Sequence, residues 1–215
     1  IRTLRVHSDG VTDLAFSSDG RQLVSASKDE TVRIWTVSGE LLHTLLGHEG
    51  DLMGVAISPD GKTIASASDD ETVILWSTEG KALRRWKDHR DDVETVAFSP
   101  DGRFLASGGW DRRVYLRNLQ TDEVQTLGGT TGYMHTVDFS PQGDRIVAGG
   151  ITGDLHVWSI GDGGNGGVEG TDLELLPGKG GSLRDVAFSP EGKYIAAGSD
   201  DGTLRVWTSR ARLRY

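Results

Sequence analysis

The sequence predicts an all-β fold built from five successive copies of one small unit. The first observation is a heptapeptide, Val-Thr-Asp-Leu-Ala-Phe-Ser at 11–17, which recurs in related form at 52–58, 93–99, 134–140 and 183–189. The second is a turn with Gly, which follows each copy within three residues. The third is another apolar element, which ends at Trp35, Trp76, Arg117, Trp158 and Trp207 and so spaces the units by 41, 41, 41 and 49 residues. A nearly fixed period of this kind marks a repeat architecture.

Each unit has the residue pattern of four short strands. In the first unit apolar residues stand at 11, 14 and 16, at 23 and 26, at 32 and 34, and at 42 and 45, with turn residues between these groups. This is strand spacing, and no helical period competes with it. The Ser-Pro-Asp-Gly segments at 58–61 and 99–102 are turns, because Pro fixes φ and Gly accepts positive φ. A four-stranded unit cannot bury both faces alone, so we expect five antiparallel blades stacked around an axis, a β-propeller.

We expect one domain over residues 1–215, a length that a single all-β domain accommodates. The last interval between units exceeds the others by eight residues, and the segment Gly-Asp-Gly-Gly-Asn-Gly-Gly-Val at 161–168 accounts for them. A flexible Gly-rich insertion is therefore predicted at 161–170. A linker is predicted at 209–215.

Composition excludes several classes of protein. The formal net charge of −9 disfavours a nucleic-acid partner, because nucleic-acid affinity comes largely from clustered Lys and Arg. The arginines at 205, 210, 212 and 214 are interpreted as a solvated tail. No window approaches the roughly 18 unbroken apolar residues of a membrane helix, so no membrane association is expected. The chain has no cysteine, which agrees with a reducing compartment, and we expect a cytoplasmic protein.

The repeat resembles that of the WD-repeat β-propellers, and the resemblance covers essentially the whole chain. Its marks are Gly47-His48 before the first strand of a unit, Ser-Pro-Asp-Gly after that strand, Ser-Ala-Ser-Asp-Asp at 66–70, and Val-Ile-Leu-Trp at 73–76. The resemblance implies a ring of blades around a central channel. It also implies a non-catalytic protein that holds other molecules together.

The resemblance further implies a hydrogen-bonded tetrad of His, Ser, Asp and Trp in each unit. The matching sets are His7, Ser25, Asp29 and Trp35 in the first unit, and His48, Ser66, Asp70 and Trp76 in the second. Indole donates only, Ser donates and accepts, and imidazole passes the link to a carboxylate. A hydrolase triad is disfavoured, because a nucleophilic triad is needed once whereas this trio repeats.

The tetrad decays toward the C-terminus. The third unit keeps His89, Ser107 and Asp111 but has Arg117 where Trp is expected. The fourth and fifth units keep their Trp, whereas Thr130 and Lys179 stand at the His position and Ala148 and Ala197 at the Ser position. We therefore expect the first two units to be the most rigid.

In WD-repeat propellers the top face around the channel commonly engages partners. Carried over position by position, this face comprises Asp51, Met53, Asp69, Asp92, Glu94, Trp110, Tyr133, His135, Arg184 and Asp200, with Ile151 among the further positions. Aromatic residues within an acidic rim predict a protein or peptide partner that carries Arg or Lys. The alternative for Trp110 is that it packs against the neighbouring blade.

No catalytic residue, metal ligand or cofactor is expected. The Gly161-x-Gly163-x-x-Gly166 pattern matches a dinucleotide fingerprint by letter count, but it opens no helix. The paired carboxylates, such as Asp69-Asp70, stand at turns, where Asp is common for conformational reasons.

Closure of the ring has two solutions. The segment 1–5 aligns with 42–46, the outermost strand of a unit, so it can pair with the third strand of the last unit around 203–207 and remove an exposed edge. This favours a closed five-bladed ring. However, residues 213–215 stand where the last unit's own outer strand would begin, so the alternative is part of a larger ring, such as a seven-bladed one, and the first residue, Ile1, leaves excision from a longer chain open.

Three classes of function follow. The first is an interaction scaffold or sensor module, free or part of a larger signalling or assembly protein. The second is an architectural propeller, left open and completed by a strand of a partner chain. The third is an enzyme built on a propeller, for which His135 beside Glu94 or Asp92 is the one set of titratable groups that can be assembled.

Overall fold

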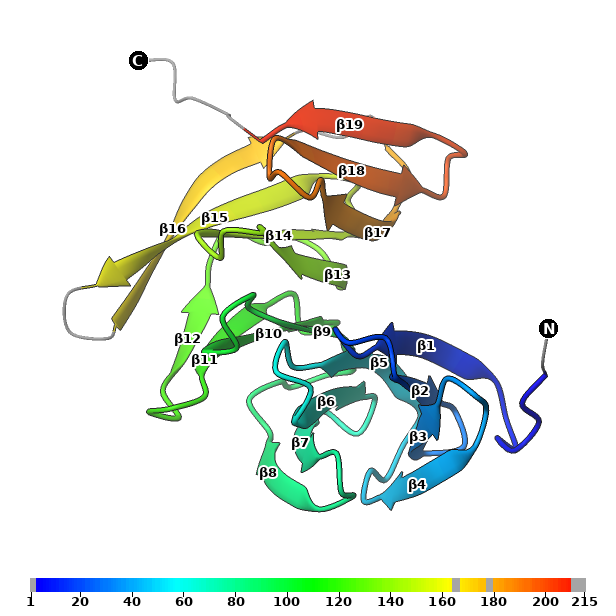
Figure 1. Ribbon diagram of the computed structural model, residues 1–215. Helices are drawn as coiled ribbons and strands as arrows, with labels where there is room; N and C mark the ends of the chain where they lie inside the picture. The colour runs from blue at the N-terminus through cyan, green and yellow to red at the C-terminus, as the bar shows by residue number, and fades with distance from the viewer. Residues whose placement is uncertain (1–2, 164–166, 177–179, 210–215) are drawn as a thin grey trace, which may run out of the picture. The chain divides into compact units, whose positions relative to one another are not determined.

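A computed structural model describes residues 3–163, 167–176 and 180–209 (Figure 1). All regular structure within these ranges is β-strand, and the strands form five antiparallel sheets, one for each predicted unit. The all-β prediction is therefore confirmed. Among these residues there is no helix long and apolar enough to cross a membrane.

The first four sheets have four strands each, and within each sheet the strands are neighbours in chain order. The first sheet comprises β1 (Val11–Phe16), β2 (Gln22–Ser27), β3 (Thr31–Thr36) and β4 (Leu41–Leu46). The second comprises β5 (Leu52–Ile57), β6 (Thr63–Ser68), β7 (Val73–Ser77) and β8 (Ala82–Trp86). The third comprises β9 (Val93–Phe98), β10 (Phe104–Gly109), β11 (Val114–Asn118) and β12 (Val124–Leu127). The fourth comprises β13 (Met134–Phe139), β14 (Arg145–Gly150), β15 (Leu155–Gly163) and β16 (Gly167–Leu176).

The fifth sheet has three strands within the described ranges, β17 (Leu183–Phe188), β18 (Tyr194–Ser199) and β19 (Leu204–Thr208). The described residues of the N-terminal segment, 3–5, are in no strand. Closure of the ring by that segment therefore stays a prediction.

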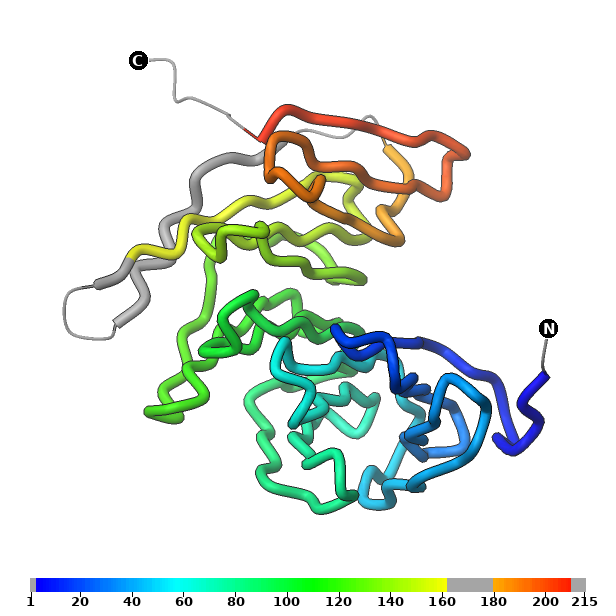
Figure 2. Tube along the Cα trace, viewed as in Figure 1, coloured from blue at the N-terminus to red at the C-terminus, as the bar shows by residue number. Residues whose placement is uncertain are grey.

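The chain divides into two compact units, residues 1–98 and 99–215, and each is described by itself. The path of the chain through the successive hairpins can be followed along the trace in Figure 2, for example from β1 to β4 in unit 1. The prediction of one domain over 1–215 concerns both units together and stays a prediction.

The Ser-Pro-Asp-Gly turns form as their residues dictate. In the turn between β5 and β6 the Ser58 hydroxyl donates to an Asp60 carboxylate oxygen at 2.7 Å and accepts from the Thr63 backbone N–H at 3.0 Å. The Gly61 N–H donates to the Ser58 carbonyl at 2.9 Å, and Gly61 has a φ of 69°. The left-handed φ is open to Gly at little cost, so the turn is closed by bonds among its own residues.

Side chains of the innermost strands join neighbouring blades. In unit 1 the Val55 N–H donates to Asp13 at 2.8 Å, and the Thr12 hydroxyl donates to the Leu52 carbonyl at 2.6 Å. In unit 2 the Phe188 N–H donates to Asp138 at 3.0 Å. These bonds link the first strand of one blade to the first strand of the next.

Apolar residues fill the space between the blades. In unit 1 the core combines residues of the first blade with residues of the second, namely Val24, Ala26, Val32, Ile34 and Leu45 with Leu52, Val55, Ile64, Ile74 and Trp76. In unit 2 Val147, Leu155 and Val157 pack with Leu183, Val186, Ile195 and Ala197. Each blade is therefore stabilised chiefly by its neighbour, as stacked repeats are.

The predicted Gly-rich insertion, 161–170, lies in the hairpin of β15 and β16. The register pairs Gly161 with Glu169 and Gly163 with Gly167. Residues 164–166 of the insertion lie outside the described residues, as do Lys179 and all of the predicted linker except Ser209.

Candidate interaction site

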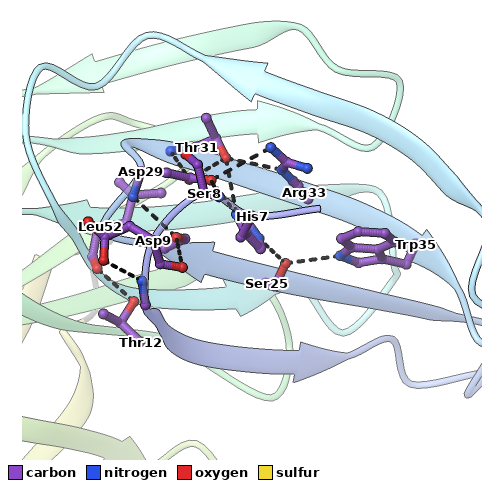
Figure 3. Close-up of polar contacts among 12 residues, drawn as sticks. His7, Ser8, Asp9, Thr12, Ser25, Asp29, Thr31, Arg33, Trp35 and Leu52 are labelled. Atoms are coloured by element: carbon purple, nitrogen blue, oxygen red, sulfur yellow. Dashed lines mark hydrogen bonds and ion pairs between the residues drawn. The ribbon is translucent and has the colours of Figure 1, made fainter. Parts of the chain in front are cut away.

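The first predicted tetrad is present in the structure (Figure 3). His7 Nδ1 lies 2.8 Å from Asp29 Oδ2, His7 Nε2 lies 2.7 Å from Ser25 Oγ, and Trp35 Nε1 donates to Ser25 Oγ at 2.9 Å. Because a carboxylate only accepts, a neutral His7 carries its proton on Nδ1, and Nε2 then accepts from the hydroxyl. The chain of bonds therefore runs from Trp35 to Asp29 in one direction.

The second tetrad has nearly the same geometry. His48 lies 2.8 Å from Asp70 and 2.7 Å from Ser66, and Trp76 Nε1 donates to Ser66 at 2.8 Å. Burial acts to raise the pKa of Asp70, but hydrogen bonds from His48, Thr72 and the Glu49 N–H outweigh it and hold that pKa well below its usual range. The pKa of Asp29 is lowered in the same way, by Thr31, His7 and the Ser8 N–H against burial.

The later blades replace the tetrad with other contacts. Buried Arg117 stands at the Trp position of the third blade and donates to the Asp122 carbonyl at 2.6 Å. Trp158 in the fourth blade donates its indole N–H to the Gly128 carbonyl at 2.9 Å, since Ala148 offers no hydroxyl. The third tetrad is divided between unit 1, which holds the buried His89, and unit 2, which holds Ser107 and Asp111, so its bonds stay a prediction.

The predicted top-face residues of unit 1 are four carboxylates and Met53. Asp51, Met53, Asp69, Asp92 and Glu94 are all half-buried. Burial raises the pKa of Asp69, and the charges of Asp51 and Asp92 raise it further. Burial and the neighbouring Asp91 raise the pKa of Asp92. The Lys28 ammonium lies 3.6 Å from Asp51 and offsets only part of this negative charge. We name Asp51, Asp69 and Asp92 the acidic cluster.

Two of the predicted top-face residues of unit 2, Trp110 and Tyr133, are aromatic and lie together. Trp110, in the turn after β10, stacks on Tyr133, in the loop before β13, with ring centroids 5.2 Å apart and planes inclined by 16°. The Arg112 guanidinium lies over the Tyr133 ring, 5.7 Å from its centroid. Trp110 thus packs against the next blade and still keeps 38% of its surface exposed. We name Trp110 and Tyr133 the aromatic pair.

An open hollow of about 290 Å³ lies beside the aromatic pair, and it is lined by Arg112, Thr131, Gly132, Tyr133, Ile151 and Thr152. The Ile151 N–H donates to the Tyr133 carbonyl at 3.0 Å, which ties the two loops together. Ile151 is 50% exposed. The hollow therefore offers an apolar wall and one cation to a ligand.

The remaining predicted residues of unit 2 form an ion pair next to a histidine. Arg184 donates two hydrogen bonds to the Asp200 carboxylate, from Nε to Oδ1 at 2.8 Å and from Nη2 to Oδ2 at 2.7 Å. Burial and the charge of Arg184 lower the pKa of His135, against the opposing effect of Asp200. The proposed enzymatic partners of His135, Glu94 and Asp92, belong to unit 1, so that hypothesis is untested. Within the described ranges, no group of three or more His, Asp or Glu side chains could hold a metal ion.

Sequence reasoning missed Arg112, Thr131 and Thr152. Arg112 follows the tetrad Asp of the third unit, where the first two units carry Glu30 and Glu71. This reversal of charge at one position of the repeat could have marked Arg112 as a candidate binding residue. The two threonines have no such signal, because they enter the hollow through loop packing.

Two family comparisons complete the description. The model described as IFT122 first beta-propeller matches residues 10–170, about three quarters of the chain. The model described as WD domain, G-beta repeat matches residues 170–208. The matches join end to end over the five blades, and the predicted WD repeat is confirmed.

Proposed function

Because the chain belongs to the IFT122 first β-propeller family and consists of WD repeats, we propose that it is a non-catalytic interaction module. It binds a protein or peptide partner on the top face of its blades, as a scaffold or sensor. The WD repeat supports such a role, because WD-repeat propellers commonly engage partners on their top face. The absence of cysteine agrees with a reducing, cytoplasmic setting for that role.

The observation that carries the proposal is the partly exposed aromatic pair. Stacked aromatic side chains give a large, rigid contact area that loses little conformational entropy on binding. Exposed Ile151 extends the same surface. Such clusters supply most of the binding energy in protein interfaces, where Trp, Tyr and Arg are the commonest hot spots.

The acidic cluster supports a partner that carries Arg or Lys. Burial and the neighbouring negative charges keep the pKa values of Asp69 and Asp92 raised. A bound cation would relieve that repulsion, so it would be attracted here more strongly than to an isolated carboxylate.

The test is affinity purification from native lysate with the wild type and with a Trp110→Ala, Tyr133→Ala variant. The variant is expected to lose at least one specific partner. Tyr194→Ala is the control, because Tyr194 is also an exposed aromatic residue of unit 2 but begins β18, whereas the top-face turns follow the ends of the second strands. If the double variant recovers the same partners as the control, the top face is not the binding surface.

We also propose that the five blades close into one ring, with the first and last blades covering one another. Val11, Leu14 and Phe16 of β1 are exposed, as are Leu204 and Val206 of β19. The same exposure favours the second candidate, an architectural ring completed by a partner chain. Mass measurement after size exclusion separates them, because a closed ring is a stable monomer whereas an open one aggregates or co-purifies with its partner.

A further inference from the structure

We propose that the hollow beside the aromatic pair binds the carboxylate of an Asp or Glu side chain in the partner. Arg112 would bind the charge, and the aromatic pair and Ile151 would contact the apolar part of the same segment. This inference rests on the proposed function, and it names the chemistry of one contact within it.

The charge of Arg112 favours an anionic ligand. Arg112 stands in the turn between β10 and β11 with a left-handed φ of 62°, the conformation that Glu30 and Glu71 adopt at the same position of the first two blades, with φ of 64° and 68°. The backbone of the turn is therefore alike at this position in three blades, whereas the charge of the side chain is reversed in the third. Arg112 is exposed, and its guanidinium lies over the Tyr133 ring at the edge of the hollow.

The construction of the hollow suits such a ligand. A Cβ atom on Gly132 would lie 2.7 Å from the γ-carbons of both Ile151 and Thr152, so only Gly allows the loop before β13 to approach the turn after β14 so closely. That approach places the hydroxyl-bearing residues Thr131 and Thr152 among the lining residues with Arg112. A guanidinium and hydroxyl donors together suit a carboxylate, which accepts several hydrogen bonds.

The number of arginines indicates the kind of anion. Only one arginine lines the hollow, whereas phosphorylated segments are recognised by clusters of arginines. Asp200, the acidic residue predicted for the top face of unit 2, is paired with Arg184, so its charge opposes an anion only weakly. A carboxylate is therefore favoured over a phosphate and over a cation.

The experiment uses three capped tetrapeptides as probes, Ac-Gly-Phe-Glu-Gly-NH2 and its Gln and Lys counterparts. Binding to the full chain is followed by methyl NMR at Ile151, whose signal is assigned with Ile151→Val. We expect the Glu peptide to shift this signal with an affinity about two- to fivefold above that of the Gln peptide at low salt, the range of one exposed ion pair. The Lys peptide is expected to bind more weakly than the Gln peptide.

Variants at position 112 then test the residue. Arg112→Asn removes the charge and tolerates the left-handed turn, so it should bring the Glu peptide down to the affinity of the Gln peptide. Arg112→Lys should keep part of the preference, since the charge remains but the planar fork is lost. Arg113→Gln is the matched control, an exposed neighbouring arginine that does not line the hollow, and it should keep the whole preference.

Equal affinity for the Glu and Gln peptides would overturn the inference, and so would a preference that survives Arg112→Asn. Tighter binding of the Lys peptide would show that the sign of the charge is wrong. None of these outcomes touches the proposed function, which fails only if removal of the aromatic pair leaves the partners recovered from lysate unchanged.

Discussion

At the scale of single residues, each intact tetrad holds a buried polar chain whose last member is a carboxylate. Asp70 accepts from His48, from the Thr72 hydroxyl and from the Glu49 N–H, and these bonds lower its pKa in spite of burial. In the unfolded chain the same carboxyl has a pKa of about 3.9. Stability must therefore depend on the ionisation of this group.

We predict that the free energy of unfolding is retained above about pH 5 and falls as the pH drops through the range of the unfolded carboxyl toward the lowered folded value. The sign follows because the unfolded state takes up its proton at the higher pH. Asp70→Asn should lower stability at pH 7 by about 1–3 kcal/mol, since the hydrogen bonds from His48, Thr72 and the Glu49 N–H lose the charge that strengthens them. It should also flatten the decline between pH 5 and pH 2. Urea unfolding at a series of pH values measures both, and an unchanged slope would contradict the argument.

The second prediction concerns the Ser position of the tetrad. At this position the residue that the repeat favours is not the one that the local hydrogen bonds of the fourth blade favour. Ser66→Ala should destabilise by about 1–3 kcal/mol, because the buried Trp76 N–H and His48 nitrogen lose their shared partner. Ala148→Ser would restore the consensus in the fourth blade, yet we expect it to destabilise too. Trp158 already donates to the Gly128 carbonyl, so a new hydroxyl would be buried without its intended partner. If Ala148→Ser instead stabilises the protein, the Trp158 indole N–H has changed its partner from the Gly128 carbonyl to the new hydroxyl.

At the scale of elements, much of the fold was predictable because the information is local. Alternation of apolar residues specifies the strands, and each Ser-Pro-Asp-Gly turn is closed by its own side chains. The hollow was not predictable in this way. It combines Arg112 with the loop at 131–133 and the turn at 151–152, which meet only through packing. The stack of Trp110 on Tyr133 likewise joins two blades. For this reason the sequence alone could not decide whether Trp110 is available to a partner or packs against the neighbouring blade.

The turn between the second and third strands of a blade provides the third prediction. Gly153 and Gly202 occupy the position of Glu30 and have φ of 76° and 80°. A Cβ on Gly202 would meet nothing within 4 Å, whereas one on Gly153 would lie 2.5 Å from the Gly181 carbonyl oxygen. Gly202→Ala should therefore lower the free energy of unfolding only through the left-handed strain, by about 1 kcal/mol. Gly153→Ala should lower it by about 1–3 kcal/mol more, because of the clash. Thermal unfolding of the two variants measures both losses of stability. Gly202→Ala reports the backbone strain alone, whereas Gly153→Ala reports the strain together with the clash. Equal losses would mean that the loop containing Gly181 moves away from the new methyl group at no cost.

At the scale of the whole molecule, the repeat explains which apolar faces remain uncovered. Leu52 and Val55 of the second blade are at most 4% exposed because the first blade covers them, whereas their counterparts Val11 and Leu14 are more than half exposed. At the other end of the series Leu204 and Val206 are 75% and 61% exposed, although their counterparts in the first blade, Val32 and Ile34, are buried in the core shared with the second blade. The two faces are thus the two halves of one type of blade interface.

Closure of the ring by these faces gives the last prediction. If the fifth blade covers the first, Leu14→Glu and Val206→Lys should each lower the free energy of unfolding by about 2–4 kcal/mol, because each places an unpaired charge in an apolar interface. The double variant should recover at least about 1 kcal/mol of the summed loss, since the counterparts Val55 and Ile34 lie in one core and the two opposite charges would meet. Val37→Glu is the control, because Val37 is equally exposed but lies just after β3, outside that core, and it should have little effect. Urea unfolding followed by tryptophan fluorescence measures the coupling. If the single variants are nearly neutral and their effects add in the double variant, the two faces do not meet, and the five blades do not close into a ring by themselves.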